Sequence, residues 1–197
     1  LVLSSARSKY MCTDDAQRGI VSIDNVHLEK VDWFTYLGSR IGPSGACENE
    51  INARICKARI AFMSMQKFWQ RKDVTMPLKL RIFNATIRSV LLYGCETWSV
   101  RKSDQVRLEV FERQCQRRIT GLPLSRQLSN KNLAILVNQK MSVAQTITAR
   151  RWTYIGHVLR MKDIRIQKRA LYATPAPDWK RPKGGVNMTL MRQMCKE

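Results

Sequence analysis

The sequence predicts a mainly α-helical protein with a small antiparallel β-hairpin or sheet at its N-terminus, which is an α+β fold. Before residue 45, short runs of strand-forming side chains are separated by turn residues. From Ser44 onward, apolar residues recur every three or four positions, which is the spacing of one helical face. Hydrophobic residues make up 44% of the 197 residues, so a buried core is feasible and the composition argues against wholesale disorder.

Three short strands are expected in the first 45 residues. Gly19–Ile23 and Val26–Leu28 flank Asp24-Asn25, a pair whose side chains favour tight turns and tolerate a positive φ. A third strand is expected at Phe34–Ser39, where large and small side chains alternate before the turn-rich Gly42–Gly45. Together these runs predict a small antiparallel sheet.

The first helix is predicted from an apolar stripe whose members are spaced by four and three residues. Basic side chains are expected to lie mainly off this stripe, on the solvent side of the helix. The stripe consists of Ile51, Ile55, Ala58, Phe62, Met65 and Trp69, and the basic set consists of Arg54, Lys57, Arg59 and Lys67.

Two further helices are bounded by capping residues. One is expected from Pro77 to about Tyr93, because proline is tolerated in the first turn of a helix. The next is expected to start at Ser103-Asp104, which can cap free N–H groups, and to stop at Gly121. The buried sides are expected to be Leu80, Phe83, Ile87, Val90 and Leu91 in one, and Leu108, Phe111, Cys115 and Ile119 in the other.

The remainder predicts shorter helices and a tail. Helices are expected near 132–138, from 142 to about 161, and near 164–172, and prolines, glycines and basic residues then predict a linker or tail. The chain is therefore expected to divide into segments 1–45, 46–122, 123–172 and 173–197.

The charge of the chain predicts a polyanionic partner. The formal net charge is +20, from 35 Lys and Arg against 15 Asp and Glu. Residues 1–50 carry 5 basic and 7 acidic residues, residues 51–120 carry 15 and 5, and residues 121–197 carry 15 and 3. Nucleic acid is the usual partner of such a surface, because each neutralised phosphate releases condensed counterions. A membrane surface and a ribosomal-type basic protein remain alternatives, although no run reaches the ~18 to 20 apolar residues of a spanning helix.

The cysteines and histidines do not predict a metal site. The six cysteines stand singly with no CxxC pair, and His27 and His157 lie far from a zinc-type spacing. Reduced thiols in an intracellular protein are therefore expected. The chain begins at Leu1, and we expect it to be a fragment.

Four segments carry a family resemblance. Leu3–Met11 is similar to an "N-x-x-K-T-K-x-M" pattern, and Phe34–Ile41 matches "F-x-Y-L-G-S-x-I". Leu91–Trp98 matches "L-L-Y-G-C-E-x-W", and Arg151–Met161 is close to "R-x-x-W-x-G-H-V-x-R-M". In this order and spacing they resemble the region after the palm in non-LTR (LINE-type) retrotransposon endonuclease–reverse transcriptases. The resemblance covers roughly residues 1–165.

The sequence departs from these family patterns at several positions. Ser4 and Arg7 replace an asparagine and a lysine in the first pattern, and Tyr154 replaces a tryptophan in the fourth. In the tail, Lys180–Val186 only partly resembles the family's "G-R-P-x-x-R-W". The tail is therefore expected to have drifted, as in a decayed or truncated copy of an element.

The resemblance implies the C-terminal part of an RNA-directed DNA polymerase without its catalytic carboxylates. Such polymerases use two Mg²⁺ ions held by paired aspartates of the palm. The only Asp pair is Asp14-Asp15, where Cys12 stands in the place of the expected aromatic residue and polar residues follow. We interpret this pair as a solvated turn, so this part of the polymerase is expected to be inactive alone and to hold neither catalytic residue nor metal. The catalytic pair would lie upstream.

The resemblance also implies roles for the four segments. Residues 1–45 correspond to the end of the palm and a primer-grip hairpin, in which Phe34, Tyr36, Leu37 and Gly38 would lie against the primer. Residues 46–122 correspond to a helical thumb, residues 123–172 to a C-terminal helical region and residues 173–197 to a basic tail. Thumb contacts to phosphates are expected from Arg54, Lys57, Arg59, Arg113, Arg117 and Arg118. The implied partners are an RNA template, a DNA primer and the upstream palm and fingers, with no membrane, inside the cell and in the nucleus during integration.

Each of these assignments has a competing interpretation. Phe34 could simply fill a core, Lys9 could be solvent-exposed rather than near a nucleotide's phosphates, and a basic helix face is often only solvated. Trp152, Gly156 and His157 are expected to pack helices rather than to bind a ligand or act as a base. A complete small nuclease or transferase would need clustered acid–base or metal-binding groups. A stand-alone basic helical module that binds nucleic acid or another partner, or a degenerate relic of a retroelement, is the alternative function.

Overall fold

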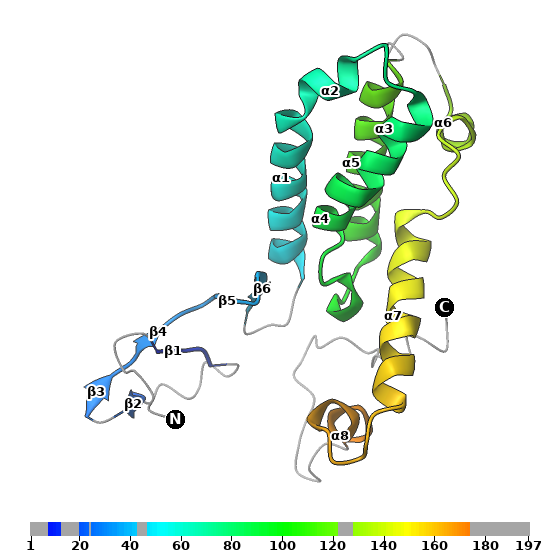
Figure 1. The fold of residues 1–197 in the computed structure, drawn as a ribbon. Coiled ribbons are helices and arrows are strands. Elements are labelled where there is room, and N and C mark those ends of the chain that lie inside the picture. Colours follow the sequence, from blue (N-terminus) through cyan, green and yellow to red (C-terminus); the bar gives the residue numbers. More distant parts are fainter. Residues whose placement is uncertain (1–7, 13–19, 24, 43–46, 122–127, 174–197) are drawn as a thin grey trace. The chain divides into compact units, whose positions relative to one another are not determined.

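The fold is mainly helical with pairs of short strands near the N-terminus, as the sequence predicts (Figure 1). The computed structural model describes residues 8–12, 20–23, 25–42, 47–121 and 128–173. The chain forms two compact units, Leu1–Val143 and Ala144–Glu197. The segment boundaries expected at residues 45, 122 and 172 stay predictions, and the expected tail lies outside the described residues.

Within the described residues, the strands form three separate pairs instead of one sheet. β2 (Ser22–Ile23) pairs antiparallel with β3 (Val26–His27), around the predicted turn at Asn25. β1 (Lys9–Tyr10) pairs with β4 (Glu29–Lys30) in parallel, so the expectation of a single antiparallel sheet is wrong in this respect.

The predicted strand at Phe34–Ser39 is a hairpin. β5 (Phe34–Tyr36) pairs antiparallel with β6 (Ser39–Ile41), and Tyr36 is opposite Ser39. The two turn residues have positive φ, 47° at Leu37 and 83° at Gly38. Positive φ at both central residues is the signature of a type I′ turn, which matches the twist of the strands it joins.

The first predicted helix is divided in two. α1 (Glu48–Ser64) ends at Met65, and the short α2 (Gln66–Gln70) follows. The predicted stripe is confirmed, because Ile51, Ala58, Phe62 and Trp69 are buried and Ile55 and Met65 are partly buried. The rings of Phe62 and Trp69 stack with centroids 5.3 Å apart, and the indole Nε1 donates a hydrogen bond to the Phe62 carbonyl at 2.9 Å. This contact turns α2 back onto the core.

The second helical segment contains a π-helical turn. α3 (Met76–Phe83) starts with Pro77 in its first turn and continues through η2 (Asn84–Arg88) into α4 (Ser89–Leu91). Phe83, Ile87 and Leu91 are buried as predicted. The helix ends before the expected Tyr93, and the 3₁₀ turn η3 (Cys95–Thr97) follows. α1, α3, α4 and α5 lie side by side and share one core (Figure 1).

The third predicted helix is α5 (Lys102–Thr120), and its ends are those expected from the sequence. The Asp104 carboxylate accepts a hydrogen bond from the Arg101 backbone N–H, and Gly121 ends the helix with φ of 65°. The predicted stripe is confirmed by the burial of Leu108, Phe111, Cys115 and Ile119. α6 (Asn130–Leu136) follows, and the Ser129 hydroxyl accepts a hydrogen bond from the N–H of Asn132.

The second unit contains most of α7 (Val143–Leu159) and all of α8 (Ile166–Tyr172). The prediction that Trp152, Gly156 and His157 pack helices is wrong for two of these residues, because Trp152 is about half exposed and His157 is exposed, whereas Gly156 is partly buried. The buried face of α7 lies elsewhere on the helix, at Ile147, Arg151, Ile155 and Val158. Among the described residues, no helix is both long and apolar enough to cross a membrane.

Candidate nucleic-acid interface

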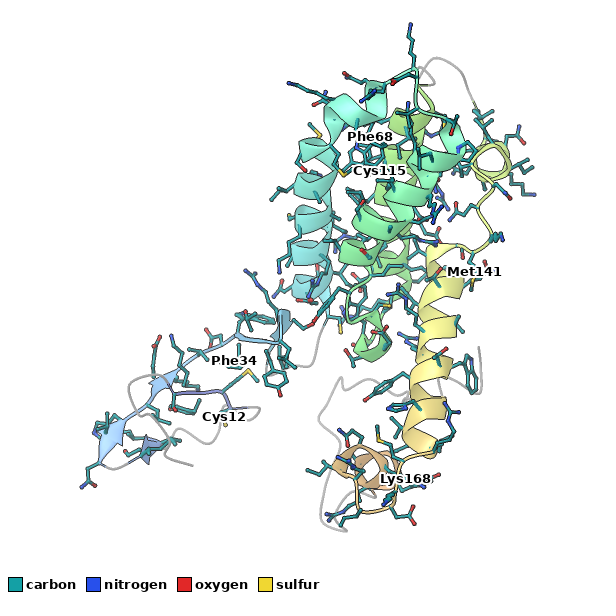
Figure 2. The ribbon with its side chains drawn as sticks, in the orientation of Figure 1. Cys12, Phe34, Phe68, Cys115, Met141 and Lys168 are labelled. Atoms are coloured by element: carbon teal, nitrogen blue, oxygen red, sulfur yellow. The ribbon has the colours of Figure 1, made fainter. Side chains whose placement is uncertain are left out.

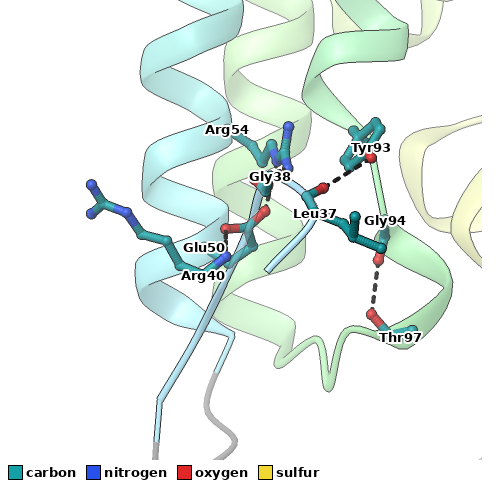
Figure 3. A network of polar contacts seen from close by, with 8 residues as sticks. All are labelled: Leu37, Gly38, Arg40, Glu50, Arg54, Tyr93, Gly94 and Thr97. Atoms are coloured by element: carbon teal, nitrogen blue, oxygen red, sulfur yellow. Dashed lines mark hydrogen bonds and ion pairs between the residues drawn. The ribbon is translucent and has the colours of Figure 1, made fainter. Parts of the chain in front are cut away.

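Two of the sequence segments that carry the family resemblance meet in the structure. The turn of the β5–β6 hairpin reaches the end of α4, where the Tyr93 hydroxyl donates a hydrogen bond to the Leu37 carbonyl at 3.0 Å (Figure 3). These residues are 56 positions apart in the chain. The hairpin turn is therefore fixed to the helical core of the first unit.

A buried ion pair on α1 supports the same turn. Glu50 and Arg54 face each other at the i, i+4 spacing, with Glu50 Oε1 2.6 Å from Arg54 Nε, and both side chains are almost fully buried. Arg54 Nη2 donates a hydrogen bond to the Gly38 carbonyl at 2.6 Å. The prediction that Arg54 lies off the buried stripe is wrong, because the guanidinium is used inside the protein.

Glu50 also holds the second strand of the hairpin. Its Oε2 accepts a hydrogen bond from the Arg40 backbone N–H at 2.7 Å, while Oε1 is paired with Arg54 (Figure 3). Hydrogen bonds to an ionised carboxylate are shorter and stronger than those between neutral groups. One carboxylate thus fixes β6 directly and the turn through Arg54.

Glycine at position 94 lets the core approach the hairpin closely. Gly94 has φ of 71°, and a Cβ at this position would lie 3.1 Å from the Ser39 hydroxyl oxygen. The Thr97 hydroxyl donates to the Gly94 carbonyl at 3.0 Å and stabilises this backbone conformation (Figure 3). A side chain here would meet both an unfavourable backbone conformation and a crowded contact.

The hairpin presents apolar side chains to solvent. Phe34 is 43% exposed, Tyr36 58% and Leu37 75%, and Ile41 on the opposite strand is 43% exposed. Figure 2 shows Phe34 on the strand segment, away from the helical core. The interpretation of Phe34 as a core-filling residue is therefore wrong. The four predicted residues lie in one hairpin, in which the rings of Phe34 and Tyr36 are partly exposed.

The predicted phosphate contacts of the helices fall into two groups. Lys57 and Arg59 on α1 and Arg118 on α5 are exposed. Arg113 is half buried and pairs with Glu109 at 2.6 Å, and Arg117 donates to the Leu128 carbonyl at 2.8 Å. Of the six predicted basic residues, Lys57, Arg59 and Arg118 are those whose side chains make the fewest hydrogen bonds and ion pairs within the described residues.

The structure brings two of these residues to one pocket. Arg59 and Arg118 line a pocket of about 320 Å³ between α1 and α5. Cys115 also lines it, and burial raises the pKa of this thiol to about 12, against the smaller opposing effect of Arg118. Cys115 is therefore an apolar lining residue at neutral pH and not a nucleophile.

No metal-binding group is evident in the part of the chain that the structure describes, where no three His, Cys, Asp or Glu side chains cluster. Asp14-Asp15 lies outside the described residues. Lys9 is in β1, partly exposed, and its Nζ pairs with Glu29 at 2.8 Å. Lys9 is therefore exposed to solvent, and its proximity to a nucleotide's phosphates stays a prediction.

Sequence reasoning missed Glu50 and Tyr93 as parts of this arrangement. Glu50 precedes Arg54 by four residues, a spacing that favours a helical ion pair and could have indicated it. Tyr93 belongs to a segment that resembles the family, but nothing in the sequence indicates that its hydroxyl reaches Leu37. This contact exists only in the folded chain.

The chain is similar to a protein derived from a transposon. Over 174 residues it is 26% identical to a putative uncharacterized transposon-derived protein of Caenorhabditis elegans. The aligned region covers 86% of this chain and 61% of that protein. The chain therefore spans less than two thirds of this relative's length. A family described only as a domain of unknown function, DUF6451, matches residues 61–93, from the end of α1 to Tyr93. No solved structure matches.

Proposed function

We propose that the chain is the C-terminal part of a retrotransposon RNA-directed DNA polymerase and that it holds template and primer. In this function the β5–β6 hairpin contacts the primer, the basic helices contact phosphates, and the upstream palm supplies the catalytic aspartates and Mg²⁺. The observation that carries the proposal is the anchoring of an exposed aromatic hairpin to the core by Tyr93 and Arg54. The transposon-derived relative supports the same origin.

The hairpin has the properties that a primer contact requires. Its turn is held by two side-chain hydrogen bonds to main-chain oxygens, so its position relative to the core is defined. Its exposed rings at Phe34 and Tyr36 offer stacking surfaces that accept any base. A polymerase that copies many sequences needs such an interaction, because the primer end changes with every nucleotide added.

The exposed basic residues suit contacts to phosphates without sequence preference. Lys57 and Arg59 have no hydrogen bond or ion pair within the described residues, so their charges are available to a partner. Phosphate contacts position nucleic acid and carry no sequence information. Arg54 is excluded from this group in our proposal, because its guanidinium pairs with Glu50 and holds Gly38. We assign it the positioning of the hairpin instead.

Salt-dependent binding of an RNA–DNA primer–template by the full chain tests the phosphate contacts. We expect log affinity to fall steeply with log salt between about 50 and 200 mM, and expect Lys57→Ala to reduce the slope by about 1. A flat salt dependence would overturn the phosphate-gripping role. Primer extension by the chain alone would overturn the assignment of catalysis to the upstream palm.

Substitution of an exposed tyrosine tests the hairpin. Tyr36→Ala is expected to weaken binding to a recessed primer end roughly 5- to 140-fold, the loss of one stacked base. Tyr172→Ala on α8 is the matched control, because Tyr172 is 64% exposed and lies outside the hairpin. Equal effects of the two substitutions, or equal affinity for blunt and recessed ends, would favour a stand-alone basic module over a primer grip.

A further inference from the structure

The pocket between α1 and α5 has an apolar floor and a basic rim. Its floor contains Phe62, Phe111 and Cys115, each at most 5% exposed, with Met63 at one side. Arg59, Gln114 and Arg118 complete the lining. A volume of about 320 Å³ lies within the range of small-molecule sites.

The rim is positively charged and has no neutralising partner in the lining. No Asp or Glu lines the pocket. Arg59 has no hydrogen bond or ion pair within the described residues, and the side-chain hydrogen bond of Arg118 there runs from Nη1 to the Met63 sulfur at 3.5 Å. Both arginines act on the same Cys115 thiol, where each opposes the rise in pKa that burial causes. The two positive charges therefore lie at the same pocket.

The floor is a rigid apolar surface. The Phe62 ring is fixed by stacking on Trp69 and by an edge contact to Phe83, with centroids 6.5 Å apart in the second pair. Buried aromatic side chains that are held on two sides do not collapse to fill a neighbouring space. The pocket is thus built from packed residues of two long helices.

An apolar floor beside two guanidinium groups fits a ligand that is flat and apolar at one end and anionic at the other. A nucleotide has this chemistry, because a base can lie on an aromatic floor while its phosphate accepts hydrogen bonds from guanidinium groups. The Gln114 amide offers both a donor and an acceptor to the edge of a base.

We propose that this pocket binds one unpaired nucleotide of a bound strand, with its base against Phe62 and Phe111 and its phosphate between Arg59 and Arg118. This inference rests on the proposed nucleic-acid function and adds a specific site to it. A base stacked within a duplex cannot enter such a pocket, so the site selects single-stranded nucleotides next to the gripped duplex.

Methyl NMR of the full chain tests the site directly. With [¹³C-methyl]methionine labelling, the Met63 methyl group reports on the pocket, and Met63→Leu assigns its signal. Adenosine 5′-monophosphate is expected to shift this signal in a saturable manner, whereas inorganic phosphate and ribose 5-phosphate, which lack the base, are expected to leave it in place.

A pair of matched variants separates the pocket from general electrostatics. Arg59→Ala is expected to weaken the mononucleotide about 10- to 100-fold, because it removes a charged hydrogen-bond donor. Arg81→Ala removes the same charge from an exposed position on α3 outside the pocket, and a change below about twofold is expected. Equal losses of mononucleotide affinity in both variants, or a Met63 signal that does not shift, would overturn the proposed nucleotide site.

The outcome of this test is distinguishable from that of the proposed function. If the chain binds primer–template in a salt-dependent manner but the Met63 signal does not move, only the pocket proposal fails. If the mononucleotide shifts Met63 but primer–template binding is flat with salt, the gripping function fails and the nucleotide pocket stands.

Discussion

The guanidinium carbon of Arg54 lies 4.3 Å from the centre of the Tyr93 ring, so a charged side chain of α1 is stacked on a residue two positions beyond the end of α4. Each partner also donates a hydrogen bond to the hairpin turn, Arg54 to Gly38 and Tyr93 to Leu37. A cation placed over an aromatic face is stabilised by the ring quadrupole. The two hairpin anchors therefore support each other as well as the hairpin.

Arg54→Met is expected to destabilise the chain by about 3–5 kcal/mol, because it leaves the buried Glu50 carboxylate without its counter-charge. The free energy of unfolding in urea, followed by circular dichroism, measures the loss. The double variant Glu50→Gln/Arg54→Met is the control, and we expect it to be more stable than the single variant. A loss below about 1 kcal/mol in the single variant would contradict the role assigned to the pair.

Leu37→Asn is expected to stabilise the chain by about 1 kcal/mol and to weaken nucleic-acid binding. Leucine adopts φ of 47° here, which costs a bulky residue roughly 1–2 kcal/mol, whereas Asn-Gly is a preferred type I′ turn sequence. Little burial is lost, because Leu37 is mostly exposed. Urea unfolding and primer–template binding are the two measurements. Leu78→Asn, at a half-exposed position in α3, is expected to destabilise instead, and stabilisation by both would point to a general effect of asparagine.

The stability of the chain is expected to contain a pH-dependent contribution from Glu112. Burial raises the pKa of this carboxyl above its ordinary value of 4.5, and Arg88 and Gln139 oppose the rise. The folded state thus binds the proton more tightly than the unfolded state, so this stability is present below about pH 4.5 and is lost as pH rises through the raised pKa. Glu112→Gln removes the contribution. The unfolding free energy of the wild type, relative to that of the variant, is expected to be larger at about pH 4.5 than at about pH 7. Parallel profiles of unfolding free energy against pH would contradict this prediction.

Thiol alkylation is expected to distinguish two cysteines on neighbouring helices. Cys56 on α1 is exposed, whereas Cys115 is buried and its thiol pKa is raised to about 12. Native alkylation at neutral pH should therefore modify Cys56 and leave Cys115 unmodified until urea is added, as peptide mass spectrometry can measure. Rapid native modification of Cys115 would contradict the expected protection of this thiol. Cys115 is expected to be protected from alkylation even when no mononucleotide is bound in the pocket.

The helices were predictable because their signals are local. The stripe that includes Phe62 and the cap at Gly121 each depend on residues within a few turns, and the structure confirms both. The hairpin turn was not predictable from propensity, because leucine at Leu37 is not a residue that favours positive φ. Tertiary contacts to Tyr93 and Arg54 hold it there.

The candidate site was predictable only in part. Exposed apolar residues such as Phe34 were singled out from the sequence, but the internal use of Arg54 was not, because a charged residue on a helix is usually solvated. Arg54 is buried among Glu50 one turn before it, the Gly38 carbonyl of the hairpin and the Tyr93 ring, and periodicity alone does not report such a combination. Trp152 shows the opposite error, because it was expected to pack against a helix but is about half exposed on α7.

The anchors of the hairpin recognise main-chain oxygens, and this has an evolutionary consequence. Every amino acid has the same carbonyl group, so a mutation at Leu37 keeps the hydrogen bond from Tyr93 as long as the backbone conformation is retained. The tip of the hairpin can therefore change its side chain among residues that tolerate a positive φ, and with it the surface offered to a partner, while its support on the core is retained. Gly38 lacks this freedom, because its φ of 83° disfavours any side chain.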